Sequence, residues 1–247
     1  MEKKEYEILF ELEDDYWWYK ELRGLVFSVI DKTFPDKDGI SLLDAGCGTG
    51  GLLAHSDIHN VYGLDISEES IKFCKIRKLR NILRASVSNI PFSSNSFDLV
   101  ISLDVLYHLG VRNDSTVLRE FYRVLAKGGV LLINLPAYNF LKSTHDIAIH
   151  TRQRYIRQDL KRKLEDAGFK IEKMTYRNTI LFPLILAIRL FERLSLKNKK
   201  TAHSDLKRMP DQLNNLLTCF LSMENRLIVS GLNFPFGLSL FCVAVKG

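Results

Sequence analysis

Ser41-Leu42-Leu43-Asp44-Ala45-Gly46-Cys47-Gly48-Thr49-Gly50-Gly51 is the stretch that decides the fold, because it joins a short apolar run to a turn rich in glycine. The apolar run, residues 41–45, predicts a buried strand. Glycine lacks a β-carbon, so it lets the backbone turn sharply and approach a ligand closely. In open α/β sheets, ligands bind at the carboxyl ends of the strands. The stretch therefore predicts a strand, a tight turn and a nucleotide-like ligand beside them.

Short apolar runs alternate with helical patterns from about residue 40 onward, which indicates repeated strand-helix units and a mainly parallel sheet. The clearest helix is expected at 115–127, where Val117, Leu118 and Phe121 begin an apolar stripe and Gly128 and Gly129 end the pattern. A second helix is expected at 157–167. Seven strands are expected, at 41–45, 61–65, 81–85, 99–103, 130–135, 170–176 and 239–245. The predicted fold class is α/β, a Rossmann-like seven-stranded, mostly parallel sheet with helices on both faces.

The segments that flank this pattern predict additions to one domain, 1–247. Residues 1–38 form an N-terminal helical extension, whose aromatic cluster Tyr16-Trp17-Trp18-Tyr19 precedes an apolar helical face. The core that binds the ligand is expected at 39–176, and the final strand region at 232–247. Between them, 177–231 is too long for a simple connection, so we interpret it as a helical insertion that caps the active site. We expect the N-terminal helix to fold over the ligand as a lid.

Composition narrows the class of protein without naming a ligand. The chain has 247 residues, a formal net charge of +6 and 46% hydrophobic content, which is ordinary for a globular domain. Its basic residues are scattered among carboxylates and no recognition module is visible, so nucleic acid is not an expected partner. The four cysteines have neither CxxC nor metal-ligand spacing, and no secretory signal begins the chain, so we expect no metal and a cytoplasmic protein. The apolar run at 180–191 is too short to span a bilayer, although contact with a membrane surface is compatible with it.

The glycine turn fits two ligands. Gly46, Gly48 and Gly51 satisfy the GxGxxG pattern of dinucleotide-binding sites, with Asp65 placed to hold ribose hydroxyls. Asp44, however, would repel the pyrophosphate of NAD, whereas it suits a ligand that carries a sulfonium and an ammonium group. S-adenosylmethionine has both groups and no phosphate.

The residues from 42 to 50 resemble the first motif of class I S-adenosylmethionine-dependent methyltransferases, and Tyr62-Gly63-Leu64-Asp65-Ile66-Ser67 resembles their second. Two further stretches, at 90–100 and 102–109, are similar to the "LPF...SFDLV...VLEHL" block of methyltransferases of type 11. The resemblance implies that the last strand runs antiparallel. It also implies that the cofactor contacts Asp44, Ala45, Gly46, Cys47, Gly48, Asp65, Ile66, Ser86, Val87 and Leu103, with His108 as a further candidate whose role we expect to be chiefly structural.

A branch of bacterial methyltransferases begins with a "WWY...R" element, which Trp17-Trp18-Tyr19 and Arg23 resemble. Aromatic faces attract cations such as a sulfonium, and an arginine can pair with the methionine carboxylate. Trp18, Tyr19 and Arg23 are therefore added to the expected cofactor site. Plain packing of the helix is the alternative interpretation.

The loop that follows the fifth strand, 136–155, resembles the "PA...L...HD...GH.RRY" pattern of the same branch. We expect His145 or His150 to accept a proton from a substrate hydroxyl, with Asp146 orienting an imidazole or binding the substrate. The alternative is that these side chains only hydrogen-bond the loop to itself. Methyl transfer is an in-line displacement that depends on alignment, so a general base is not essential.

These observations together predict a methyltransferase that converts S-adenosylmethionine to S-adenosylhomocysteine. We expect an oxygen acceptor on a small molecule, a sugar or a lipid-linked intermediate, because an apolar cap followed by a basic stretch suits an amphipathic substrate. Two alternatives stay open at this point, namely an NAD-dependent oxidoreductase and a non-catalytic protein that binds S-adenosylmethionine and regulates a partner.

Overall fold

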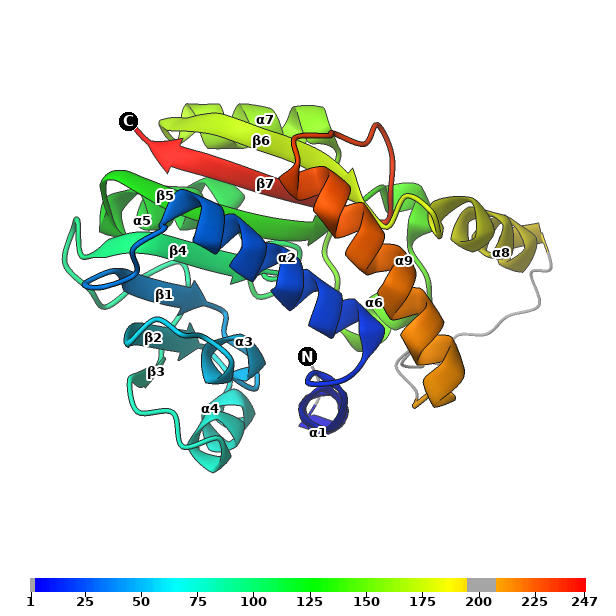
Figure 1. The fold of residues 1–247 in the computed structure, drawn as a ribbon, viewed down its shortest axis with the longest axis horizontal. Coiled ribbons are helices and arrows are strands. Elements are labelled where there is room, and N and C mark those ends of the chain that lie inside the picture. Colours follow the sequence, from blue (N-terminus) through cyan, green and yellow to red (C-terminus); the bar gives the residue numbers. More distant parts are fainter. Residues whose placement is uncertain (1–2, 195–207) are drawn as a thin grey trace.

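A seven-stranded mixed sheet forms the centre of the molecule, as Figure 1 shows. The computed structural model describes residues 3–194 and 208–247. The strand order is β3-β2-β1-β4-β5-β7-β6, and β7 runs antiparallel to both of its neighbours. The remaining paired strands are parallel. The strands are β1 (Ser41–Ala45), β2 (Asn60–Asp65), β3 (Ile82–Arg84), β4 (Phe97–Leu103), β5 (Leu125–Pro136), β6 (Phe169–Arg177) and β7 (Ser239–Lys246). The predicted Rossmann-like sheet and its antiparallel last strand are confirmed.

The central strands are buried on both faces, which explains why they are apolar runs rather than alternating patterns. Leu42 and Leu43 of β1 are both fully buried but belong to different core clusters, one on each face of the sheet. On one face pack α2 (Trp17–Thr33), α3 (Gly51–Ala54), α4 (Glu68–Ile76) and α9 (Asp211–Val229), and on the other α5 (Asp114–Val124) and α7 (Arg157–Asp166). The remaining helices are α1 (Lys3–Leu12), α6 (Thr144–Ala148), α8 (Phe182–Leu194) and the short 3-10 helix η1 (Asn139–Leu141).

The helix expected at 115–127 is shorter than its pattern suggested. Asn113 caps α5 by accepting hydrogen bonds from the backbone of Ser115 and Thr116, and the helix ends at Val124. Leu125 already pairs with Phe97, so β5 begins directly after the helix. The prediction that Gly128 and Gly129 end the helix was therefore wrong, because the chain has entered the sheet before it reaches them.

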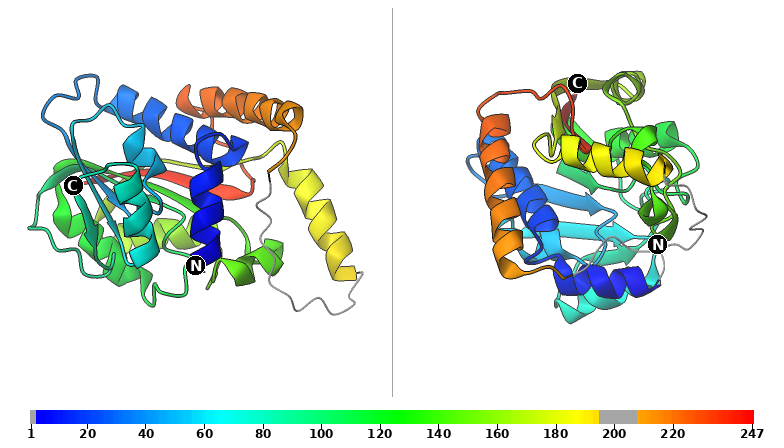
Figure 2. Two further views of the ribbon diagram at one scale, coloured as in Figure 1. Left: turned by 90° about the horizontal axis from the view of Figure 1, so that it is seen from below. Right: turned by 90° about the vertical axis from the view of Figure 1, so that its right-hand side faces the viewer.

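The two helices of the expected insertion at 177–231 lie in different places (Figures 1 and 2). α9 runs alongside α2 and packs against it on the sheet, whereas α8 lies at one end of the molecule. Residues 195–207 of that segment lie outside the described residues. In the described part of the chain, no helix is long and apolar enough to cross a membrane.

Candidate active site

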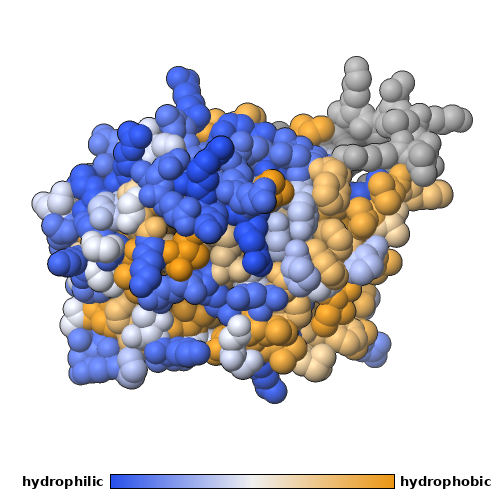
Figure 3. Space-filling model, turned by 90° about the horizontal axis from the view of Figure 1, so that it is seen from above, coloured by the Kyte–Doolittle hydropathy of each residue, from blue (hydrophilic) through white to orange (hydrophobic). Residues whose placement is uncertain are grey.

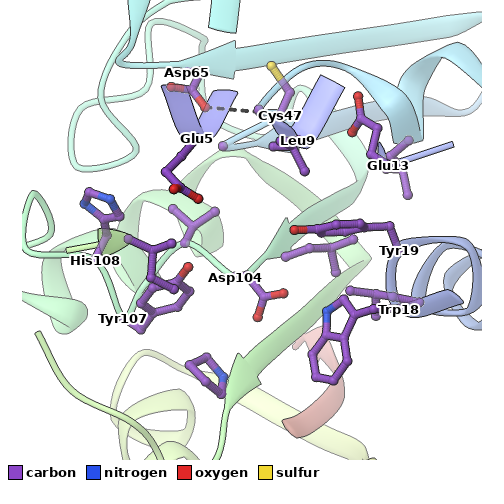
Figure 4. A pocket seen from close by; sticks show the side chains of 18 of the residues that line it. Glu5, Leu9, Glu13, Trp18, Tyr19, Cys47, Asp65, Asp104, Tyr107 and His108 are labelled. Atoms are coloured by element: carbon purple, nitrogen blue, oxygen red, sulfur yellow. Dashed lines mark hydrogen bonds between the residues drawn. The ribbon is translucent and has the colours of Figure 1, made fainter. Parts of the chain in front are cut away.

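A cavity of about 490 Å³ opens at the carboxyl ends of the parallel strands. Its floor is the turn after β1 together with the ends of β2, β4 and β5, and its walls come from α1, α2, the loop 136–155 and α8. Figure 4 shows carboxylates and aromatic rings around it, with Asp104 among Trp18, Tyr19 and Tyr107. This is the edge at which open α/β sheets bind their ligands.

The turn after β1 is fixed to β2 by its own backbone. The N–H groups of Gly46 and Cys47 both donate to the carbonyl of Leu64, at 2.8 and 3.0 Å. Gly46 has a φ of +96°, and a β-carbon there would lie 2.3 Å from a methyl group of Val105. Glycine is therefore required at this position for both conformation and space.

Asp65 lines the cavity at the end of β2 and is held in place by two backbone donors. The N–H of Gly48 donates to its Oδ2 at 3.1 Å, and the N–H of Ser67 donates to its Oδ1 at 2.9 Å. Burial nevertheless raises the pKa of Asp65. The carboxylate is thus presented in one orientation beside the turn, as Figure 4 shows.

Asp44 lines the cavity from the end of β1, with only 3% of its surface exposed. Among the residues that the structure describes, no donor or basic side chain is bonded to its carboxylate. Burial, reinforced by the neighbouring Asp65 and Glu13, raises its pKa to about 8. A buried carboxylate normally has a partner. A cationic ligand in the cavity would supply one and would favour the charged form.

Helix α1 covers the glycine turn, a contact that the sequence analysis missed. Leu9 lies next to Gly48, and the carboxylate of Glu13 accepts hydrogen bonds from Thr49 and, at 2.9 Å, from Arg77 of the segment after α4. Arg77 also contacts Asp14 at 3.1 Å. The N-terminal helices are thus tied to the turn itself. In the sequence, the acidic cluster at 13–15, directly before the aromatic residues, was the signal that could have indicated this contact.

Of the aromatic N-terminal element, Trp18, Tyr19 and Arg23 all line the cavity. The guanidinium of Arg23 donates to the backbone carbonyls of Glu13 and Asp14, at 2.9 and 2.8 Å. These bonds close the connection between α1 and α2. The Arg23 side chain therefore stabilises the arrangement of α1 and α2, which form walls of the cavity.

Asp104, directly after β4, is the second carboxylate that sequence reasoning missed. The amide of Asn134 donates to its Oδ1 at 3.0 Å, and its own N–H donates to the carbonyl of Asn134 at 2.8 Å. Burial raises its pKa to about 6. Figure 4 places it among Trp18, Tyr19 and Tyr107, pointing into the cavity. An acid at the carboxyl end of a central strand was the signal that could have identified it.

In the loop 136–155, Asp146 pairs with an arginine, whereas the sequence hypothesis expected it to orient an imidazole or to bind the substrate. Asp146 is 4% exposed and forms a two-pronged ion pair with Arg154, at 2.8 and 3.0 Å, which lowers its pKa despite burial. It also accepts a hydrogen bond from the backbone N–H of Ser143. Both Asp146 and Arg154 line the cavity, but each charge is satisfied by the other.

Of the two histidines whose side chains are described beside this loop, only His108 lines the cavity. His150 is not among the residues that line the cavity, and its ring lies 5.9 Å from that of His108. His108 does line the cavity, and burial lowers its pKa to about 4, so it is neutral at physiological pH. The side chain of His145 lies outside the described residues.

Most of the expected cofactor residues meet at this one cavity. Those that line it are Trp18, Tyr19, Arg23, Asp44, Gly46, Cys47, Gly48, Asp65, Ile66, Ser86, Val87, Leu103 and His108. Ala45 is fully buried and belongs to the core behind the turn instead. The structure therefore brings together segments that the sequence separates by more than eighty residues.

Comparison with known proteins agrees with this geometry. Residues 43–133 match the family model described as a methyltransferase domain. A probable S-adenosylmethionine-dependent methyltransferase of Mycolicibacterium smegmatis is 29% identical over 65% of this chain and 62% of its own length. An uncharacterized protein of Methanocaldococcus jannaschii is 34% identical over 54% of the chain and 51% of its own. The chain thus spans between half and two thirds of the length of these curated relatives.

Among solved structures, an S-adenosylmethionine-dependent methyltransferase from Archaeoglobus fulgidus has the same fold, with a TM-score of 0.56 at 20% identity over 91% of this chain and 94% of its own. The sheet order, the glycine turn and the acids beside it define the class I methyltransferase fold. Residues 43–133 therefore carry a methyltransferase domain of the class I S-adenosylmethionine-dependent type. Of the two ligands that the turn allowed, the family match therefore favours the methyl donor S-adenosylmethionine.

Proposed function

We propose that this protein transfers a methyl group from S-adenosylmethionine to an oxygen atom of a small-molecule, sugar or lipid-linked acceptor. The observation that carries the proposal is one cavity that holds two carboxylates. Asp44, buried beside the glycine turn, has no bonded partner among the residues that the structure describes, and Asp104 lies among aromatic rings. One acid suits the cationic donor, and the other is available to an acceptor.

The residues around the turn fit the donor. Asp44 would face the cationic groups of the amino acid part and Asp65 the ribose hydroxyls, while the backbone of Gly46, Cys47 and Gly48 permits close approach. The proposed cofactor set also includes Trp18, Tyr19, Arg23, Ile66, Ser86, Val87, Leu103 and His108, but not Ala45, which is buried in the core behind the turn. When bound, the donor supplies an electrophilic methyl group on its sulfonium.

Asp104 is the proposed general base for the acceptor hydroxyl. With a pKa of about 6 it is mostly ionised at neutral pH, and yet it is basic enough to take a proton during the transfer. Asn134 fixes the orientation of its carboxylate through Oδ1. Trp18, Tyr19 and Tyr107 wall the site and exclude water, which strengthens electrostatic interactions inside it.

The histidine hypothesis of the loop is retained in a narrower form. Only His145 stays a predicted proton acceptor, because His150 does not line the cavity. Asp146 is proposed to position Arg154 rather than to orient an imidazole, because the two groups are paired. Asp104 lines the cavity and His150 does not, so Asp104 is the better placed of the two to accept a proton from the substrate.

An amine acceptor is the second candidate, and the charge of the cavity favours it. Among the described residues, six acids line the cavity against three arginines, of which Arg23 donates to backbone carbonyls and Arg154 pairs with Asp146. The acids are Glu5, Glu13, Asp44, Asp65, Asp104 and Asp146, and the third arginine is Arg189. An acidic, aromatic site attracts an ammonium group.

Single-turnover transfer from labelled S-adenosylmethionine, measured across hydroxyl and amine acceptors, tests the proposal. We expect Asp104→Asn to lower the rate with a hydroxyl acceptor by roughly a hundredfold. The wild-type rate should rise as the pH passes about 6, and this rise should vanish in the variant. Asp57→Asn, which changes an exposed carboxylate that does not line the cavity, is the control.

The outcomes separate the alternatives. Transfer only to amines, with a pH profile that follows the amine, would replace the oxygen acceptor by the nitrogen one. A rate that Asp104→Asn leaves unchanged on every acceptor would exclude Asp104 as the base. Tight binding of S-adenosylhomocysteine without turnover on any acceptor would instead favour the non-catalytic regulatory protein.

A further inference from the structure

The outward face of helix α8 is apolar and exposed, which is the reverse of an ordinary surface helix. Residues 182–191 read Phe-Pro-Leu-Ile-Leu-Ala-Ile-Arg-Leu-Phe, with Arg189 as their one charged residue. We define the α8 face as Leu184, Ile188, Leu190 and Phe191. Their exposed fractions are 60, 42, 50 and 70%, so the helix exposes several large apolar side chains rather than a single one.

The inward side of α8 belongs to the active site. Ile185 and Arg189 line the cavity, whereas the four residues of the α8 face are exposed. The first turn anchors the helix, since the ring of Phe182 lies 5.8 Å from that of Tyr138 and 5.3 Å from that of Phe236. Beyond this turn, the α8 face is left uncovered by the described protein.

Two aromatic side chains continue the apolar surface beyond the helix. Phe236 is 40% exposed beside Phe182, and Phe140 is 44% exposed and stacks on Tyr138, at 5.0 Å between ring centroids. Figure 3 shows apolar residues gathered at the end of the molecule where Figure 1 places α8 and α9, in contrast to the polar opposite end. The surface therefore has both aliphatic and aromatic members.

Charge points to the occupant of this surface. The chain carries 35 Lys and Arg against 29 Asp and Glu, yet the cavity concentrates acids, so the positive surplus lies on the outside. The sequence after the helix, 195–208, contains five Lys or Arg residues and one Asp. A helix that is apolar on one side, too short to span and accompanied by basic sequence is suited to lie in the plane of an anionic membrane surface.

We propose that the α8 face docks on an anionic lipid bilayer, with α8 lying in the interface and its inward side still forming a wall of the cavity. Docking would place the cavity beside the lipid headgroups, so an acceptor held in the membrane could reach it without leaving the bilayer. That consequence for the acceptor rests on the proposed function, whereas the docking itself does not.

Co-sedimentation with vesicles tests the docking. The probes are vesicles of phosphatidylcholine alone and vesicles of phosphatidylcholine mixed with phosphatidylglycerol, with neither donor nor acceptor present. We expect the wild type to bind the anionic vesicles, less so at high salt, and to bind the neutral ones weakly. The double variant Leu184→Gln/Phe191→Gln should lower binding by roughly tenfold or more, since it removes two large apolar side chains from the contact.

Ile76→Gln is the matched control, because Ile76 is 62% exposed at the end of α4 and lies outside the α8 face. It should bind vesicles like the wild type. Both variants should bind S-adenosylhomocysteine normally, which shows that they are folded and separates this test from the proposed function. The proposal is overturned if the wild type ignores anionic vesicles or if the double variant binds them unchanged. It is also overturned if sedimentation velocity shows a dimer that the double variant dissociates, because the face would then contact a second copy.

Discussion

The two ends of the cavity are built in different ways. The donor end is formed by the turn after β1 and the end of β2, where backbone bonds from Gly46, Cys47 and Gly48 fix the geometry. The acceptor end combines Asp104 with side chains from α2, the loop 136–155 and α8, which are distant in sequence. A site fixed by backbone within a short segment has little freedom to vary, whereas one assembled from separate helices and loops can change its substrate while the sheet stays the same.

The largest effect is expected at the donor end, from Gly46→Ala. The new β-carbon would overlap Val105 and would have to adopt a φ of +96°. Strain and overpacking of this kind cost about 2 to 5 kcal/mol. We expect calorimetry to show a loss of roughly a hundredfold in affinity for S-adenosylhomocysteine.

Gly39→Ala separates strain from contact, because Gly39 has a φ of +80° with no atom within 4 Å of the added β-carbon. This control should destabilise the protein by about 1 kcal/mol and leave the affinity unchanged. Equal losses of affinity in the two variants would mean that the turn acts through general stability and not through its approach to the ligand.

Asp44→Asn is expected to have a smaller effect than Gly46→Ala. It should make the ligand-free protein more stable at high pH and weaken the binding of the ligand. The folded state keeps Asp44 protonated up to a pKa of about 8, whereas in the unfolded chain the group ionises near its ordinary value of 3.8. The folded state therefore binds more protons, and the stability of the ligand-free protein falls as the pH rises from about 4 to about 8. In the asparagine variant, the stability of the ligand-free protein should decrease much less over this pH range. Its affinity for S-adenosylhomocysteine should drop by roughly tenfold.

Thermal unfolding of the ligand-free protein at about pH 5 and about pH 8, together with calorimetry, measures both effects. Asp57→Asn is the control, since that exposed carboxylate pairs with Lys37 and does not line the cavity. A variant that is no more stable than the wild type at the higher pH would show that Asp44 has another partner in solution.

The sequence predicted the donor end far better than the acceptor end, for a physical reason. Asp44, the glycines and Asp65 occupy fixed places at strand ends, so periodicity and turn chemistry locate them before the fold is known. Asp104 also stands at a strand end and could have been located in this way, but its role and that of Glu13 could not be assigned, because both depend on which side chains the fold places opposite them. The pairing of Asp146 with Arg154 is likewise a tertiary contact, formed within a loop whose sequence pattern suggested catalysis.

The end of α5 was missed because a continuous apolar stripe does not distinguish the last turn of a helix from the first residues of a buried strand. Leu125 satisfies both patterns, and pairing with Phe97 decides for the strand. The apolar α8 face had a sequence signal, but only the structure shows which side of the helix faces the cavity.

The smallest effect is expected from His150→Asn, which sharpens the comparison at the acceptor end. His150 has a φ of +56°, a conformation that asparagine tolerates, so the substitution should not disturb the loop. Because the His150 side chain does not line the cavity and Asp104 does, the variant should lower single-turnover transfer less than about threefold, against the roughly hundredfold expected for Asp104→Asn. His150 also contributes to the low pKa of His108, so its removal should move that pKa upward, which an imidazole titration by NMR would detect. A loss in rate as large as that of Asp104→Asn would restore His150 as the base and would mean that the loop rearranges when the acceptor binds.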